Sequence, residues 1–284
     1  MSEENKGVAL ITGTSSGIGY AAAIALQNAG FKVFAGAPET NSETDELKRL
    51  GIEVLEFDIT NEESCRAAVK AAEAENGAVS VLVNNAGYGQ YGPIEEIPLD
   101  AIRHNFEVNV FGLIKLSQLV LPGMRNAGKG RIVNVSSVAG EIKQPGSGIY
   151  HATKHAVEAV DGALRAEVDG FGIQIVGVLP GPVGTNFAET AVAQIPETGP
   201  DSPYFVFKQN LAKVTRQMLD PGKTATLTPE DVAEVIVKAA TVENPSVNYH
   251  VGTMSKVMAA VSGLLPDKVW DAAMQQQIPM DKKI

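Results

Sequence analysis

Near its N-terminus the sequence reads Val8-Ala9-Leu10-Ile11-Thr12-Gly13-Thr14-Ser15-Ser16-Gly17-Ile18-Gly19, an apolar run that leads into a glycine-rich turn. The run lacks the alternation of a half-buried strand, so it predicts a strand covered on both faces of a parallel sheet. The alanine-rich segment 20–29 after it predicts a helix. Glycines at such a junction let a pyrophosphate approach the backbone at the helix N-terminus. They equally suit a turn into a closely packed helix, and the spacing G-x-x-x-G-x-G differs from the more common G-x-G-x-x-G.

Strand and helix patterns alternate along the rest of the chain. Short apolar runs predict strands over 8–11, 31–35, 52–57, 79–84, 130–135, 173–179 and 247–251. Helices are predicted over 20–29, 44–50, 62–76, 99–125 (with a bend near Pro122), 150–168, 205–219, 229–240, 256–264 and 267–276. This alternation predicts an α/β fold, a Rossmann-type doubly wound parallel sheet flanked by helices. We expect one domain over 1–284, with a substrate-side loop region at 186–228 and a C-terminal helical extension at 253–284.

Composition excludes several classes of function. The 284 residues are 44% hydrophobic and 20% charged, as in ordinary globular proteins, and the net charge of −10 argues against a nucleic-acid partner. Cys65 is the only cysteine, which excludes an internal disulfide, and the four histidines show no metal-ligand spacing. The N-terminus is polar and acidic, unlike a targeting peptide, and no apolar run reaches the roughly 20 residues of a membrane span. We therefore expect a cytoplasmic protein without a metal.

A second motif carries chemistry. Tyr150 and Lys154 lie four residues apart on a predicted helix, hence on one face, and Ser137 comes just after a predicted strand. A nearby ammonium favours the phenolate and so lowers the pKa of a tyrosine, while a serine hydroxyl can hold the oxygen of a reacting carbonyl or alcohol. Such a set suits proton transfer at a C–O bond. Tyrosine and lysine at this spacing also occur by chance on many helices.

Taken together, the motifs resemble those of the short-chain dehydrogenase/reductase family, over about residues 6–252. The motifs that carry the resemblance are Thr12-Gly13-x-x-x-Gly17-x-Gly19, Asp58, Asn84-Asn85-Ala86-Gly87, Asn109, Ser137, Tyr150-x-x-x-Lys154 and Pro180-Gly181. Thr153 departs from the family's usual serine but keeps a hydroxyl. The hydroxysteroid-dehydrogenase-like members are the most similar in overall pattern.

The resemblance implies a role for each matching residue. Tyr150 would be the acid/base and Ser137 would polarise the substrate oxygen. Lys154 would hold the nicotinamide ribose and lower the pKa of Tyr150, and Asn109 would anchor a water that links Lys154 to solvent. Asn84 and Gly87 would shape the adenosine-ribose side. The predicted dinucleotide-binding residues are Gly13, Ser15, Ser16, Gly17, Ile18, Gly19, Ala37, Pro38, Asp58, Ile59, Asn85, Ala86, Gly87, Tyr150, Lys154, Pro180, Gly181, Val183 and Thr185.

The function implied is an NAD(P)-dependent oxidoreductase that interconverts a carbonyl and a secondary alcohol. An epimerase or dehydratase also uses YxxxK, but such relatives usually have another glycine spacing and a longer C-terminal domain. A dinucleotide-sensing binding module is the third possibility, although such proteins commonly lose the tyrosine or the lysine. A C-terminal apolar stripe either covers a hydrophobic steroid-, lipid- or aryl-ketone-like substrate or packs on the sheet or a neighbouring subunit. Its members are Val257, Val261, Leu264, Leu265, Val269 and Trp270.

Two further expectations concern the cofactor and the assembly. Ala37 and Pro38 stand where an acidic residue or an arginine would select between NAD and NADP, and Asp58 either contacts the adenine or merely forms a turn. The acidic segment 39–46 slightly favours NAD. The resemblance also implies a homodimer or homotetramer, through helices 99–125 and 150–168. The residues expected at that contact are Ala101, Phe106, Val110, Leu113, Ala156, Ala159, Ala163 and Ala166.

Overall fold

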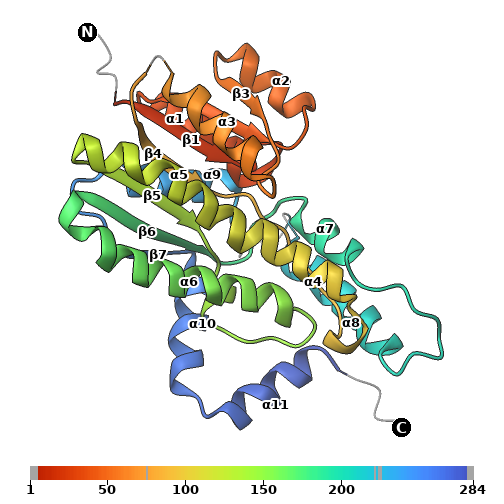
Figure 1. Ribbon diagram of the computed structural model, residues 1–284. Helices are drawn as coiled ribbons and strands as arrows, with labels where there is room; N and C mark the ends of the chain where they lie inside the picture. The colour runs from red at the N-terminus through yellow and green to blue at the C-terminus, as the bar shows by residue number, and fades with distance from the viewer. Residues whose placement is uncertain (1–5, 75, 221, 223–225, 280–284) are drawn as a thin grey trace.

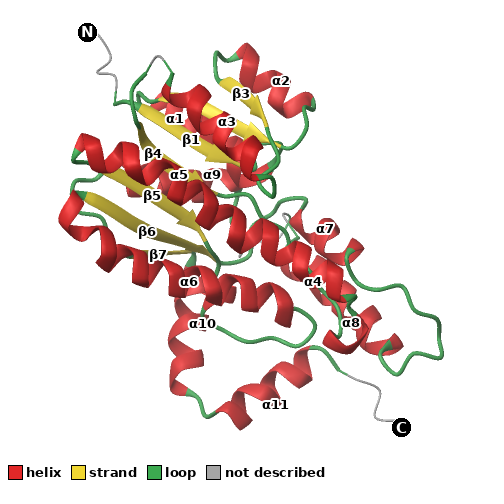
Figure 2. Cartoon of the chain, viewed as in Figure 1, coloured by secondary structure: helices red, strands yellow, loops and turns green. Residues whose placement is uncertain are grey.

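A single twisted sheet of seven strands forms the centre of the molecule (Figures 1 and 2). The computed structural model describes residues 6–74, 76–220, 222 and 226–279; the polar N-terminal residues 1–5, parts of the predicted regions 186–228 and 253–284, and position 75 lie outside them. The strand order is β3-β2-β1-β4-β5-β6-β7, and every neighbouring pair is parallel. The predicted doubly wound parallel sheet is thus confirmed.

The elements follow the predicted alternation closely. The strands are β1 Val8–Thr12, β2 Lys32–Ala37, β3 Glu53–Glu56, β4 Val79–Asn84, β5 Gly130–Val135, β6 Ile173–Pro180 and β7 Asn248–Val251. The α-helices are α1 Gly17–Asn28, α2 Ser42–Arg49, α3 Glu62–Glu73, α4 Leu99–Phe106, α5 Gly112–Ala127, α6 Gly148–Val168, α7 Phe187–Ala193, α8 Phe205–Met218, α9 Pro229–Thr241, α10 Thr253–Leu264 and α11 Asp267–Gln277. Short helical turns are η1 Ile94–Glu96, η2 Glu107–Phe111, η3 Val138–Gly140 and η4 Asp169–Phe171.

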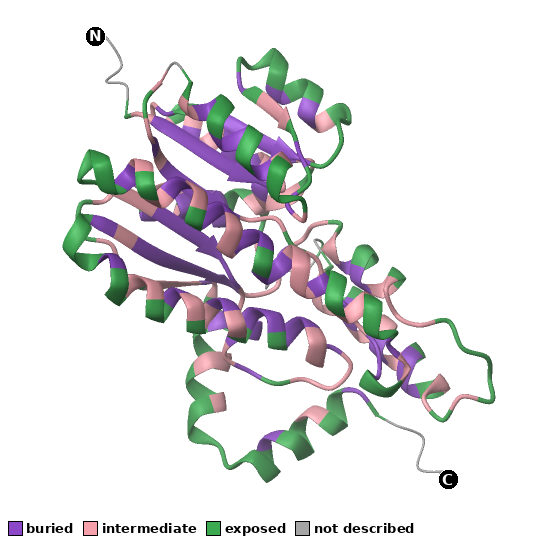
Figure 3. Cartoon of the chain, in the orientation of Figure 1, coloured by how far each residue is buried: buried purple, intermediate pink, exposed green. Residues whose placement is uncertain are grey.

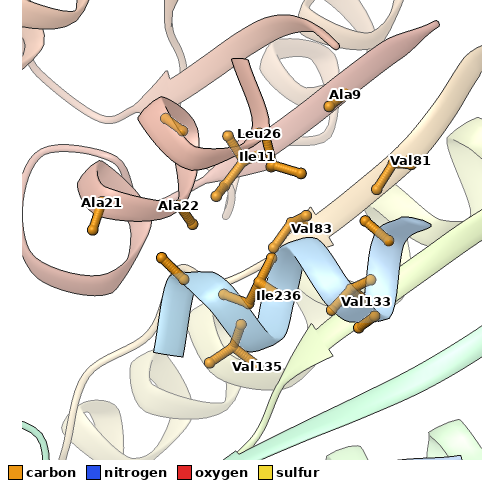
Figure 4. Packing of buried hydrophobic residues seen from close by; sticks show 14 of the residues in the cluster. Ala9, Ile11, Ala21, Ala22, Leu26, Val81, Val83, Val133, Val135 and Ile236 are labelled. Atoms are coloured by element: carbon orange, nitrogen blue, oxygen red, sulfur yellow. The ribbon is translucent and has the colours of Figure 1, made fainter. Parts of the chain in front are cut away.

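Two apolar layers hold the helices onto the sheet. On one face α1 and α9 pack over the strands, where Ile236 lies beside Val83 and Val133 (Figure 4). On the other face α3, α5 and the end of α6 cover residues such as Leu10 and Leu82. Because successive side chains of a strand point to opposite faces, an uninterrupted apolar run supplies both layers at once. The predicted burial of the first strand on both sides is therefore confirmed.

The order of the strands fixes where a ligand can bind. The chain builds β1, β2 and β3 outward in one direction and then returns to place β4 on the other side of β1. The loops after β1 and β4 consequently leave the sheet in opposite directions and open a crevice at the carboxyl ends of these strands. The glycine-rich turn and the Asn85-Ala86-Gly87 segment are the two loops concerned.

The long helix predicted over 99–125 is divided differently from the expectation. Its hydrogen bonding changes to a π-helical pattern at η2, Glu107–Phe111, whereas Pro122 lies inside α5. The helix therefore continues through Pro122, and the expected bend there stays a prediction. The π-helical segment carries Asn109.

The C-terminal extension stands apart from the sheet. In Figure 1, α10 and α11 extend away from the strands, and Figure 3 shows that most of their residues are exposed. Trp270 is buried, and its indole nitrogen donates a hydrogen bond to the Lys143 carbonyl at 2.7 Å. Among the described residues no helix is both long and apolar enough to cross a membrane.

Candidate active site

A cleft of about 900 Å³ opens at the carboxyl ends of the strands. All the predicted catalytic and dinucleotide-binding residues border this cleft except Gly19 and Asn109, which lie behind its wall. Within the described part of the chain, no cluster of histidine, cysteine or acidic side chains could hold a metal ion. The cleft therefore brings together residues that are far apart in the sequence, from 12 to 277.

The turn after β1 forms a cradle that only glycine permits. Gly13 and Gly17 have φ values of +71° and +55°, which L side chains rarely adopt. A Cβ on Gly19 would lie 2.1 Å from the Gly13 carbonyl oxygen, so this glycine allows α1 to pack directly on the turn. Asn85 fixes the turn from β4, since its side-chain amide donates to the carbonyls of Thr12 and Gly13.

The geometry of this cradle fits a dinucleotide pyrophosphate. The first turn of α1 borders the cleft, and the side chain of its N-cap, Ser16, makes no capping hydrogen bond to the described residues. The first N–H groups of the helix thus remain free for a negatively charged ligand, which the helix dipole also favours. The residues present consequently fit the cofactor that the sequence motif implies.

Tyr150 lies at the inner end of the cleft and is 8% exposed. Burial raises the pKa of its phenol to about 12, although a hydrogen bond with Ser137 lowers the pKa in part. Ser137 is itself oriented by the Ala139 N–H, which donates to its hydroxyl at 3.1 Å. The two residues that the sequence motif selects therefore border the same cleft.

Lys154 is buried beside the tyrosine. Its ammonium donates to the Val135 carbonyl at 2.9 Å and lies 5.9 Å from the centre of the Tyr150 ring. Burial lowers the pKa of Lys154 to about 8, against the opposing effect of Glu158 and Asp161. Desolvation thus acts on both members of the pair, and the pKa of Tyr150 is raised rather than lowered as the sequence had led us to expect.

Asn109 holds α6 from behind by hydrogen bonds. Its Oδ1 accepts from the Tyr88 N–H, and its Nδ2 donates to the Tyr88 carbonyl and to the Thr153 hydroxyl at 3.0 Å. Thr153 in turn donates to the Tyr150 carbonyl at 2.7 Å. The π-helical segment therefore joins the loop after β4 to the turn of α6 that carries the tyrosine. Asn84, expected to border the adenosine side, is instead buried and bonds Ser117 and Asn134.

The opposite end of the cleft is bordered by Ala37, Pro38 and Asp58. The Asp58 carboxylate accepts hydrogen bonds from the backbone N–H and the hydroxyl of Thr60, each at 2.8 Å. Asp58 therefore forms a turn, as one of its two interpretations expected, and its contact with the adenine stays a prediction. Among the described residues that border the cleft, Lys154 is the only lysine or arginine, and it lies at the far end.

The wall beyond the tyrosine is apolar, and sequence reasoning missed most of it. Tyr91 and Phe187 stand against Tyr150, with ring centroids 6.1 and 5.4 Å from its own. Four of the seven methionines border the cleft, namely Met218, Met254, Met258 and Met274. These methionines come together only in the folded chain, because they lie far apart in the sequence, and no short sequence pattern predicts that they share a wall.

The C-terminal stripe does not cover the cleft as one interpretation expected. None of its residues borders the cleft, and all except Trp270 are exposed. The other face of these helices, which includes Met254, Met258 and Met274, turns toward the cleft instead. The alternative of packing on the sheet is likewise wrong for the exposed members, such as Leu264 at 82% exposure.

Known proteins resemble this chain along nearly its whole length. The uncharacterized oxidoreductase YbbO of Escherichia coli strain K12 is 34% identical over 94% of this chain and 93% of its own length. The NADPH-dependent 3-dehydrocapnine reductase of Ornithobacterium rhinotracheale is 33% identical over 93% and 94%. A short chain dehydrogenase/reductase of Burkholderia phymatum, solved in complex with NAD, has a TM-score of 0.77 at 26% identity and covers 100% of this chain and 99% of its own.

The family model for short chain dehydrogenases matches residues 7–196, which contain the glycine cradle, Ser137, Tyr150 and Lys154. This chain belongs to the short-chain dehydrogenase family and is an oxidoreductase.

Proposed function

We propose that this enzyme interconverts a carbonyl and a secondary alcohol, with Tyr150 as the acid/base. The observation that carries the proposal is that Tyr150 and Ser137 border the same cleft as the glycine cradle, with Lys154 buried beside the tyrosine. A proton donor and a group that holds the substrate oxygen thereby face one reacting atom.

The dinucleotide, when bound, supplies or accepts the hydride at the substrate carbon. In the reducing direction the Ser137 hydroxyl holds the carbonyl oxygen, and Tyr150 transfers its proton to that oxygen. The ammonium of Lys154 then stabilises the phenolate, whose formation burial opposes. Asn109 and Thr153 keep the turn of α6 in place by the hydrogen bonds described above.

The substrate in this proposal is hydrophobic. The aromatic rings of Tyr91 and Phe187 and the four methionines form the wall next to Tyr150. Methionine side chains are flexible and fill irregular spaces, so such a wall suits an alkyl or ring system better than a small polar substrate. A relative that is named as a 3-dehydrocapnine reductase supports carbonyl reduction.

For the cofactor we propose NAD over NADP. Ala37 and Pro38 provide no charge at the position that meets the adenosine ribose, and the neighbouring Asn41 instead donates to the Ser15 carbonyl. An added phosphate would find no lysine or arginine among the described residues of this end of the cleft. The named relatives include one solved with NAD and one described as NADPH-dependent, so the proposed preference for NAD rests on the residues of this chain alone.

The test is a screen of ketones and secondary alcohols with both dinucleotides, followed at the absorbance of the reduced nicotinamide. On the best substrate, Tyr150→Phe should lower kcat at least about 100-fold, because the proton donor is lost, while the dissociation constant of the dinucleotide changes little. Wild-type turnover by the Tyr150→Phe variant would contradict the role of the tyrosine. The absence of turnover with every substrate would favour a dinucleotide-binding module.

A further inference from the structure

The residue next to the catalytic tyrosine, His151, carries a polar atom that the proposed mechanism does not use. His151 is 5% exposed, borders the cleft, and lies with its ring at 87° to that of Tyr150, the two centroids 6.1 Å apart. The two rings are close enough together for one small substrate to contact both.

The hydrogen bonding of His151 fixes which nitrogen carries the proton. Its Nδ1 lies 2.7 Å from the Ile142 carbonyl oxygen, and because a carbonyl can only accept, Nδ1 carries the hydrogen. Burial lowers the pKa of His151 to about 4, so the ring is neutral near pH 7 and its other nitrogen, Nε2, is a bare acceptor. No hydrogen-bond partner for Nε2 occurs among the described residues.

Space is open on two sides of this ring. A second cavity of about 440 Å³ shares Gln144, His151 and Met274 with the main cleft, so the imidazole stands in the wall between the two. Gln144 and Met274 stand beside His151 in this wall, and an acceptor without a donor there is costly once water is excluded. A bound substrate that supplies a donor removes this cost, whereas one that lacks it leaves the cost in place.

We propose that His151 selects substrates that carry a hydrogen-bond donor, a hydroxyl or an amine, close to the reacting carbonyl. The inference rests on the proposed function, since it concerns the substrate of the same reaction. His151 is a specificity-determining residue in this account, and it takes no part in proton transfer.

The test uses a set of matched straight-chain ketones. The set comprises a methyl ketone, its derivatives with a hydroxyl or an amine on the methyl carbon, and the methyl ether of the hydroxyl compound, which can accept but not donate. With the wild-type enzyme, kcat/KM for the hydroxy or the amino ketone should exceed that for the plain ketone and the ether by about tenfold, the worth of one ordinary hydrogen bond. Whichever of the two compounds shows the gain identifies the donor.

The variant His151→Asn isolates the acceptor. An asparagine amide nitrogen can replace Nδ1 as the donor to the Ile142 carbonyl, but nothing occupies the place of Nε2. The preference, which is the ratio of the kcat/KM values of two ketones within one variant, should therefore fall to near one, while the dissociation constant of the dinucleotide stays close to that of the wild type. The matched control is His155→Asn, because His155 borders the second cavity and not the main cleft, and this variant should keep the preference.

Two results separate the inference from the proposed function. Turnover of all four ketones at equal efficiency, or a preference that survives in His151→Asn, would overturn the role of His151 and leave the carbonyl chemistry intact. Failure of every ketone and alcohol with both dinucleotides would overturn the proposed function, and the role of His151 with it.

Discussion

At the scale of single residues, Asp161 is a buried acid with an incomplete set of partners. The Asn134 amide donates to its Oδ1 at 2.5 Å, but its Oδ2 has no hydrogen-bond partner among the described residues. Burial raises the pKa of Asp161 from 3.8 to about 7, with Asn134 acting in the opposite direction. Between these values the folded chain holds a proton that the unfolded chain has lost, so Asp161 makes stability fall as the pH rises from about 4 to 7.

Asp161→Asn should remove this dependence, since the amide stays neutral and can still accept from Asn134. The variant should gain up to about 4 kcal/mol over the wild type at pH 8, and the gain should shrink toward pH 4. Urea unfolding at a series of pH values measures the difference, with the exposed Asp201→Asn as the control. A difference between variant and wild type that does not vary with pH would contradict the assignment.

Pro38 is the residue at which the choice of dinucleotide can be tested. Pro38→Arg should raise the ratio of kcat/KM with NADP to that with NAD by about tenfold or more, because a guanidinium pairs with the ribose phosphate through two hydrogen bonds. Steady-state kinetics with both cofactors give the ratio. Glu243→Gln, beyond the end of α9, changes the net charge by the same amount and should leave the ratio unaltered. A wild-type preference for NADP would refute the proposed use of NAD.

At the scale of elements, α6 presents a row of exposed small residues, Ala159, Ala163 and Ala166. Two of the residues expected at a subunit contact, Val110 and Leu113, are instead buried in the chain's own interior at 5% exposure. Phe111, from the π-helical turn beside them, is 48% exposed. Because the extra residue of a π turn rotates the residues after it about the helix axis, the sequence pattern assigned these side chains to the wrong face.

The association through these helices remains a prediction, and it now has a sharper test. We expect a homodimer or homotetramer by light scattering, with α6 of one copy against α6 of the next. Ala163→Arg should give monomers, because an arginine cannot fit between closely packed helices, and Ala272→Arg on α11 should leave the assembly unchanged. A wild-type chain that is monomeric at micromolar concentration would rule the contact out.

The same elements show what a sequence discloses and what it does not. Apolar runs bounded by glycine located every strand, and the order of the motifs placed nearly every predicted site residue at the cleft. Those signals are local, because each depends on neighbouring residues along the chain. The π-helical turn, the methionine wall and the inward face of α10 and α11 depend on packing between distant segments, and no short pattern encodes them.

At the scale of the whole molecule, the lining of the cleft comes from two parts of the chain. The cradle and the proposed catalytic side chains come from residues 12–185, within the part that the family model matches. The four methionines of the apolar wall come from residues 218–274, after the match ends at 196. These methionines lie on α8, α10 and α11, which are outside the sheet.

The residues of the methionine wall can therefore vary independently of the glycine cradle. A graft that exchanges this wall must keep α9 and β7, because these two elements also follow residue 196 but belong to the core of the sheet. If the enzyme reduces ketones as proposed, a library for new substrates should therefore place its diversity at Met218, Met254, Met258 and Met274.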